Sequence, residues 1–195
     1  MAPETRQQMI TTAARLFQRD GYNATSWRGL VEAAGAPWGS IHHHFPGGKA
    51  ELGVAGIDAG RDAVAAIIDR CFAEQPDVSK AVERWVEVSA RLLVDSGYES
   101  GCPVATVALE TLGGPEPVRH ASRRALDAWQ KQIATHLRNG GISRTRAADA
   151  ATSVLALLEG SLLLSRVQRS DRPMRIAARQ ARAIVIAAVG SSSAE

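Results

Sequence analysis

Apolar side chains recur every three to four residues along almost the whole of this 195-residue chain. Leu126, Trp129, Ile133 and Leu137 form one such series, which places all four on the same face of an α-helix. Glycine and proline interrupt the pattern at intervals, and the alternation of apolar and polar residues that indicates a strand is absent from the sequence. The chain is therefore predicted to be all-α, with about nine helices.

The composition is typical of a folded protein. Hydrophobic residues make up 45% of the chain and charged residues 22%, and the formal charge of +3 permits an anionic partner without requiring one. Residues 1–50 carry five Lys or Arg against three Asp or Glu, so this segment is able to face phosphate. Residues 116–182 carry thirteen basic and five acidic side chains, which we interpret as a solvated face of the helices rather than a second binding surface.

Cysteine content and the N-terminal sequence predict a cytoplasmic protein. The two cysteines, Cys71 and Cys102, are far apart in the sequence and have no metal-ligand spacing, so a reducing compartment is expected. The N-terminus is polar and contains no recognisable signal peptide. The apolar stretches Val154–Leu164 and Ala183–Val189 are shorter than the ~20 residues of a membrane span, so no membrane partner is expected.

The stretch from Thr25 to Lys49 predicts two short helices joined by a tight turn. Thr25 or Ser26 supplies a side-chain acceptor for the free N–H groups at the start of the first helix. Gly35 ends that helix because glycine tolerates a positive φ, and Pro37 suits the first turn of the second helix. In a helix-turn-helix motif the second helix enters the DNA major groove, so the expected partner of this segment is double-stranded DNA.

The last two predicted helices, about residues 143–169 and 174–189, are apolar on more than one narrow face. Such helices must be buried on several sides. We predict that the pair packs against its copy in a second chain, as a four-helix homodimer interface. The alternative is that both are interior core helices of one chain. The predicted interface residues are Leu155, Leu162, Val167, Ile184 and Val185.

Motifs in the first third of the chain carry a family resemblance when they are taken together. They are Leu16-Phe17, Gly21-Tyr22-Asn23-Ala24-Thr25-Ser26, Ala33-Ala34-Gly35, Gly39-Ser40-Ile41, His44-Phe45, Lys49 and Leu52. This set resembles the DNA-binding domain of TetR/AcrR-type transcriptional regulators. Within that family, the segments Pro46–Lys49 and Gly101–Val104 resemble the LmrA/YxaF branch.

The resemblance implies an all-helical homodimer with a three-helix DNA-binding domain, here residues 1–62, and a larger effector-binding and dimerisation domain, residues 63–195. It implies a regulator, most often a repressor, that leaves a palindromic operator when it binds a small hydrophobic or aromatic effector. It identifies neither the effector nor the operator. Two alternatives are a small-molecule-binding helical protein or enzyme without specific DNA binding, and a nonspecific architectural DNA-binding protein.

The residues expected to contact DNA lie on or beside the two short helices, whereas Ile41 and Phe45 are expected to point inward. The family usually has tyrosine where this chain has His42, whose shorter side chain still donates to phosphate. Trp38, also unusual for the family, either contacts DNA or packs back onto Trp27. The predicted DNA-binding set is Thr25, Ser26, Arg28, Trp38, Gly39, Ser40, His42, His43 and Lys49.

We predict no metal, no cofactor and no catalytic centre. The consecutive histidines His42–His44 would lie about 100° apart around a helix, so they cannot converge on one ion. The segment Gly47–Ala50 lacks P-loop spacing, and the sequence contains no GxSxG, paired-carboxylate or Cys–His signature, so an enzyme is not expected. The candidate effector-binding residues, each of which is alternatively a plain core residue, are Trp85, Cys102, Val104, Leu109, Trp129 and Leu158.

Overall fold

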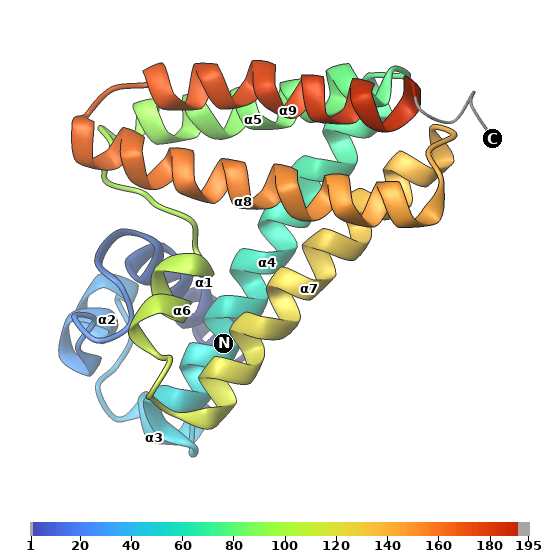
Figure 1. Ribbon diagram of the computed structural model, residues 1–195. Helices are drawn as coiled ribbons and strands as arrows, with labels where there is room; N and C mark the ends of the chain where they lie inside the picture. Colours follow the sequence, from blue (N-terminus) through green and yellow to red (C-terminus); the bar gives the residue numbers. More distant parts are fainter. Residues whose placement is uncertain (1, 191–195) are drawn as a thin grey trace. The chain divides into compact units, whose positions relative to one another are not determined.

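The structure is a computed structural model that describes residues 2–190, together with the side chains in that range except those of residues 2, 3, 40 and 41. The described residues form nine α-helices and no strand, which confirms the predicted all-α fold (Figure 1). The helices are α1 (Ala2–Asp20), α2 (Trp27–Ala34), α3 (Ser40–His44), α4 (Gly48–Glu74), α5 (Val78–Asp95), α6 (Ala105–Glu110), α7 (Glu116–Asn139), α8 (Arg144–Gln168) and α9 (Arg172–Gly190).

Local signals in the sequence set several helix ends. The Asp77 carboxylate accepts hydrogen bonds from the backbone N–H groups of Ser79 (2.9 Å) and Lys80 (3.3 Å), and so caps α5. The Ser79 hydroxyl donates a further hydrogen bond to this carboxylate and lowers the pKa of Asp77. The start of α3 differs from the prediction, because this helix begins at Ser40 rather than near Pro37.

The helices belong to two compact units, each of which is described by itself. Unit 1 consists of the described residues up to Ala63 together with Cys102–Leu126. The division after Ala63 lies next to the boundary predicted at residue 62, but α6 and the first part of α7 also belong to unit 1, whereas the prediction placed them in the second domain. The largest buried side chains of this unit are Met9, Phe17, Leu30, Phe45, Leu52 and Ile57.

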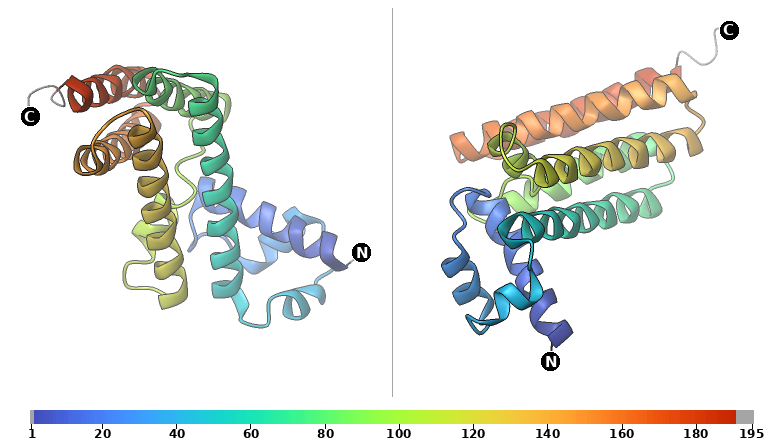
Figure 2. Two further views of the ribbon diagram at one scale, coloured as in Figure 1. Left: turned by 90° about the vertical axis from the view of Figure 1, so that its right-hand side faces the viewer. Right: turned by 90° about the horizontal axis from the view of Figure 1, so that it is seen from below.

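Unit 2 consists of Val64–Gly101 and the described residues from Asp127 onward. In this unit α5 and α8 each pack against α9, and Figure 2 shows α8 and α9 side by side from two further directions. The largest buried side chains of this unit are Ile68, Trp85, Leu93, Trp129, Ile133 and Leu137.

Helix α8 is the most apolar long helix of unit 2. Among the described residues it is the one helix that is long and apolar enough, by length and composition alone, to cross a membrane. One face of α8 is buried within the chain through Val154, Leu158 and Ser165, and α9 packs along the helix. Packing inside unit 2 therefore accounts for the apolar residues on this face of α8.

Candidate DNA-binding site

Helix α2 and the turn after it are fixed by their caps. The Ser26 hydroxyl accepts a hydrogen bond from the N–H of Gly29 at 3.0 Å, so Ser26 rather than Thr25 is the N-cap. At the other end Gly35 has φ of 61°, and the next residue, Ala36, donates from its N–H to the carbonyl of Val31. This left-handed cap reverses the chain and leads it toward α3.

The inner face of the motif is buried. Leu30, Val31 and Ala34 of α2 are almost inaccessible to solvent, which is the face that their spacing predicts. Phe45, directly after α3, is fully buried, and the Arg6 guanidinium of α1 lies 5.0 Å from the centre of its ring. These contacts tie α2 and the end of α3 to the core of unit 1. The inward orientation predicted for Ile41 concerns a side chain outside the described residues.

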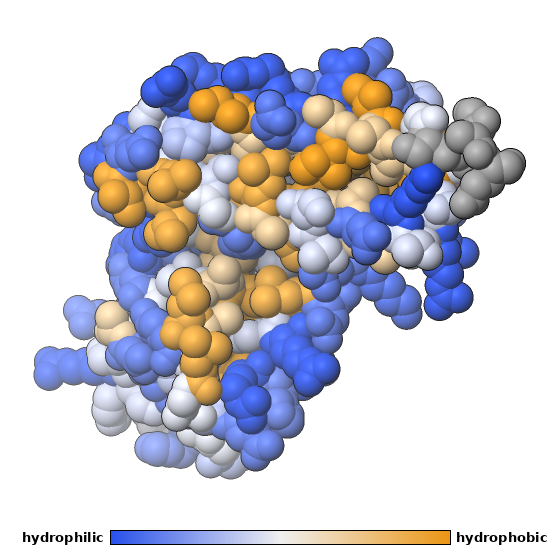
Figure 3. All heavy atoms as spheres, viewed as in Figure 1, coloured by the Kyte–Doolittle hydropathy of each residue, from blue (hydrophilic) through white to orange (hydrophobic). Residues whose placement is uncertain are grey.

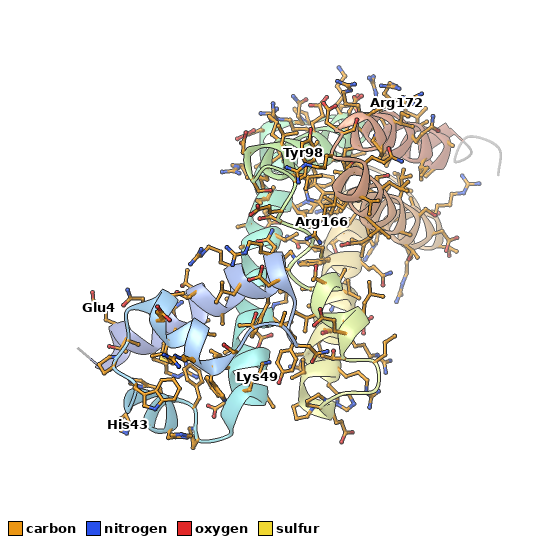
Figure 4. All side chains as sticks on the ribbon, turned by 90° about the vertical axis from the view of Figure 1, so that its left-hand side faces the viewer. Glu4, His43, Lys49, Tyr98, Arg166 and Arg172 are labelled. Carbon is orange, nitrogen blue, oxygen red and sulfur yellow. The ribbon has the colours of Figure 1, made fainter. Side chains whose placement is uncertain are left out.

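The outer face of the motif is exposed to solvent. Arg28 on α2 and both His42 and His43 on α3 are exposed, and Figure 4 shows His43 at the outer surface of α3. Trp38 has 63% of its surface exposed, so it does not pack in the core as one alternative proposed. Trp38 and Gly39 lie in the turn that precedes α3, not on the helix itself. The side chain predicted to contact DNA from Ser40 lies outside the described residues.

Two residues of the predicted DNA-binding set have internal partners. Thr25 is buried, and its hydroxyl donates to the carbonyl of Gly21 at 2.7 Å, so this side chain is structural and the prediction of a phosphate contact needs correction. Lys49 is half-buried, with its ammonium 4.5 Å from the centre of the Tyr22 ring. Burial lowers the pKa of Lys49, an effect that the charge of Glu110 partly offsets.

The histidines of α3 lie side by side on one short helix. The rings of His43 and His44 are 5.1 Å apart and meet edge to face. Among the residues that the structure describes, no group of three His, Cys, Asp or Glu side chains is placed to hold a metal ion. Cys71 and Cys102 are buried and form no disulfide, and burial raises the pKa of the Cys71 thiol.

The candidate effector-binding residues are divided between the two units. Trp85, Trp129 and Leu158 are buried in unit 2. Cys102 and Val104 are buried in unit 1, and Leu109 in the same unit is 70% exposed, so it lines no interior. Three of the six are therefore buried residues of unit 2, and the other three belong to unit 1.

Unit 2 also carries two grooves that the sequence did not predict. One, of about 400 Å3, lies between α5 and the start of α9, and its lining includes Arg91, Asp95, Asp171, Met174 and Arg175. The other, of about 500 Å3, lies between α7 and α8 and is lined mainly by polar side chains. Neither groove includes a residue of the predicted effector-binding set. No sequence signal marks these grooves, because each is formed by side chains of two different helices that the fold brings together.

The predicted dimer residues differ in exposure. Leu155, Leu162 and Val185 are buried within the single chain, so they are core residues of unit 2 and have little surface left for a partner. Ile184 is half-buried, and Val167 is 77% exposed. Figure 3 shows apolar residues gathered over α8. On α8 and α9 the prediction missed the exposed apolar residues Leu163, Leu164, Ile176, Ile186 and Val189.

A capped helix, a glycine turn and a second helix whose inner end is anchored on a core define a DNA-binding protein of the helix-turn-helix class. Residues 9–55 match the family model for bacterial regulatory proteins of the tetR family. Residues 78–180 match the model for the C-terminal domain of LmrA/YxaF-like transcriptional regulators. The chain belongs to the TetR family of transcriptional regulators, in its LmrA/YxaF-like branch.

Relatives of known sequence span nearly the whole chain. The HTH-type transcriptional regulator LmrA of Bacillus subtilis is 32% identical over 172 residues, which cover 88% of this chain and 91% of LmrA. An uncharacterised HTH-type transcriptional regulator of Mycobacterium tuberculosis, Rv0196, is 30% identical over 93% of this chain and 94% of its own length. The family resemblance inferred from the short motifs is thereby confirmed.

Solved structures share the fold. A TetR transcriptional regulator from Legionella pneumophila is similar with a TM-score of 0.80 at 23% identity, over 89% of this chain and 93% of that chain. The regulatory protein TetR from Rhodobacter sphaeroides is similar with a TM-score of 0.82 at 22% identity, over 91% and 97% of the two chains. At these identities the likeness concerns the fold alone.

Proposed function

We propose that this regulator binds a palindromic operator as a homodimer through α2, the turn and α3, and that a small hydrophobic or aromatic effector releases it. The observation that carries the proposal is the two-sided character of the motif. Leu30 and Phe45 anchor its inner side, while Trp38, His42 and His43 project from its outer side. An outer side held in this way presents its side chains to the major groove in a fixed register.

The exposed side chains suit different parts of DNA. Arg28 and the exposed start of α2 at Ser26 face phosphate, because free N–H groups and the positive end of a helix attract anions. Gly39 allows the backbone to approach the duplex closely, and Trp38 contacts thymine methyl groups or sugars. His42 and His43 donate to phosphate, and a protonated imidazole does so more strongly. Ser40 completes the proposed set.

The proposed homodimer uses the exposed apolar residues of α8 and α9. Leu163, Leu164 and Val167 of α8 are each more than half exposed, as is Ile186 of α9, and together they form a surface of the kind that dimers bury. A twofold dimer presents two copies of α3 to DNA. Recognition of a palindrome then requires that these copies lie about 34–36 Å apart, one turn of the duplex.

We propose Trp85, Trp129 and Leu158 as the effector contacts in unit 2, since aromatic side chains stack on planar apolar ligands. An effector that binds better to a conformation with the wrong spacing of the two α3 helices lowers operator affinity by that difference in binding free energy. The effector thereby releases the protein from the operator and relieves repression. A protein that acts on chromosomal DNA in this way works in the cytoplasm.

Footprinting of the region upstream of the protein's own gene tests the proposal. We expect a protected palindrome whose affinity exceeds that of random duplex DNA and falls as salt rises. Equal affinity for both DNAs would support a nonspecific binder instead. Tight ligand binding without salt-dependent DNA affinity would support a small-molecule-binding protein or an enzyme. A thermal-shift screen of planar aromatic compounds tests the effector class separately.

A further inference from the structure

The peptide groups of Asn23 are held between two opposite charges. Asn23 lies in the loop that joins α1 to α2, and its N–H donates to the Glu110 carboxylate at 2.8 Å. Its carbonyl accepts from the Lys49 ammonium at 3.4 Å. Glu110 is the last residue of α6 and Lys49 lies in the first turn of α4, and all three residues belong to unit 1. Two helices thus hold one loop residue from both sides.

The position of the Glu110 carboxylate depends on a glycine. Gly21 has φ of 87°, and a Cβ added there would collide with the Glu110 carboxylate. A side chain at position 21 is therefore disfavoured by the backbone conformation, and it would also displace the Glu110 carboxylate from its place. Glu110 reaches across 87 residues of sequence to this loop, so the contact is tertiary and not a local turn.

Lys49 is held by two contacts within unit 1. Its ammonium lies over the Tyr22 ring as well as against the Asn23 carbonyl, and Tyr22 is itself buried against Phe17, with 5.6 Å between the ring centres. Figure 4 shows Lys49 on α4 within unit 1. A half-buried ammonium with a carbonyl and an aromatic face as partners has fewer donors left for a DNA phosphate than an exposed lysine has.

The loop held in this way leads directly into the DNA-binding motif. Thr25 ties the loop to itself through the carbonyl of Gly21, and the next residue, Ser26, is the N-cap of α2. A displacement of Asn23 therefore moves the start of α2 and the exposed residues that follow it. Helix α6 is in this way connected to the orientation of the helix-turn-helix motif.

We propose that Glu110 and Lys49 form a clamp on the Asn23 backbone, and that both are positioning residues for operator recognition rather than DNA ligands. This inference rests on the proposed function, because it concerns the same DNA-binding surface. It also replaces the direct phosphate contact that the sequence predicted for Lys49. The two roles differ in one measurable quantity, since only a phosphate contact releases counterions.

For Glu110→Ala, simple electrostatics and the positioning role predict opposite changes in operator affinity. Removal of an acidic charge alone strengthens binding to DNA. Loss of the clamp instead weakens operator binding about tenfold, the effect of removing one charge-assisted hydrogen bond, and leaves affinity for random duplex DNA unchanged or slightly higher. Glu110→Gln keeps an oxygen that accepts from Asn23, so we expect it to retain most of the operator affinity.

Glu116→Ala is the matched control. Glu116 also lies in unit 1, and its carboxylate is 3.6 Å from the exposed side chain of His120. Its replacement by alanine removes the same negative charge as Glu110→Ala. We expect no loss of operator affinity in this variant. The proposal is overturned if Glu110→Ala binds the operator as tightly as the wild type or more tightly, or if Glu116→Ala shows the same loss. Fluorescence anisotropy with labelled operator and random duplexes at one ionic strength measures all four proteins.

Lys49→Met keeps the apolar stem and removes the charge, and it stays informative even if Glu110→Ala fails to fold. We expect weaker operator binding with an unchanged dependence of log affinity on log salt concentration. A salt slope that falls by about one unit would assign Lys49 to a phosphate and remove it from the clamp.

Amide hydrogen exchange separates failure of the clamp from failure of the proposed function. If the wild type prefers no DNA sequence, the proposed function is wrong, but the clamp still predicts a slow Asn23 amide. We expect Glu110→Ala to accelerate exchange in residues 21–26 at least tenfold relative to Glu116→Ala. An unchanged exchange rate in the folded variant would show that the carboxylate does not hold the loop.

Discussion

Replacement of Trp38 by alanine separates operator recognition from stability. Trp38 is 63% exposed and lies in the turn before α3, so its loss is expected to change the free energy of unfolding by no more than about 0.5 kcal/mol. If the indole contacts bases or sugars in the major groove, its removal costs about 1–3 kcal/mol of operator binding. That range corresponds to an affinity lower by roughly 5- to 150-fold.

Trp27→Ala is the control for this substitution within the same motif. Trp27 is half-buried, and its truncation is expected to cost about 2 kcal/mol of stability, part of the ~3–5 kcal/mol lost when a fully buried tryptophan is truncated. Fluorescence anisotropy with operator and random duplexes measures the change in DNA-binding affinity, and urea denaturation measures the change in the free energy of unfolding. If Trp38→Ala retained the full preference for operator over random DNA, Trp38 would play no part in recognition.

Three further substitutions address the turn, the acid stability and the dimer. Gly35→Ala is expected to cost about 1–2 kcal/mol in urea denaturation, because φ of 61° is unfavourable for alanine while no atom obstructs its Cβ. The Gln132 amide donates to the Asp69 carboxylate at 2.7 Å and lowers the pKa of Asp69. The contribution of Asp69 to stability is therefore present above about pH 4 and is lost as the pH falls through the lowered pKa, so Asp69→Asn should make unfolding below about pH 4 less pH-dependent. Val167→Glu is expected to yield monomers in light scattering, whereas the same charge at the exposed Ala128 of α7 should leave the dimer intact.

Local chemistry allowed the helices and their ends to be predicted from the sequence. The carboxylate of Asp77 caps α5, and Gly35 ends α2, because each acts on N–H or carbonyl groups only a few residues away. The start of α3 was missed. Proline at position 37 suits the first turn of a helix, but it is equally suited to the extended segment that here precedes Ser40.

Tertiary contacts account for what the sequence could not predict. Thr25 and Ser26 are adjacent and chemically similar, yet one is buried against Gly21 and the other caps α2 in solvent. Which face of an apolar helix is internal depends on neighbours that are distant in sequence, and so Val185 was mistaken for an interface residue. Glu110 carried no local signal at all, because its partner lies 87 residues away.

The exposure of the outer face of α2 and α3, in contrast, was predicted correctly from the sequence. Arg28, His42 and His43 are exposed as expected, because the apolar period of the motif determines its inner face and leaves these positions on the other side. The resemblance to the family then indicated that the expected partner of this face is double-stranded DNA. Geometry adds that Lys49 is engaged within unit 1, which no spacing rule for the motif indicates.

Selection of binding sites from a random pool of duplex DNA measures operator recognition most directly. We predict enrichment of a palindrome whose half-sites are centred about 10–10.5 base pairs apart, or a multiple of that distance, as a twofold pair of α3 helices requires. We also predict that a protein with Trp38→Ala enriches a degenerate version of the same site. A pool that shows no enrichment after repeated rounds with the wild-type protein would contradict sequence-specific DNA recognition by this helix-turn-helix motif.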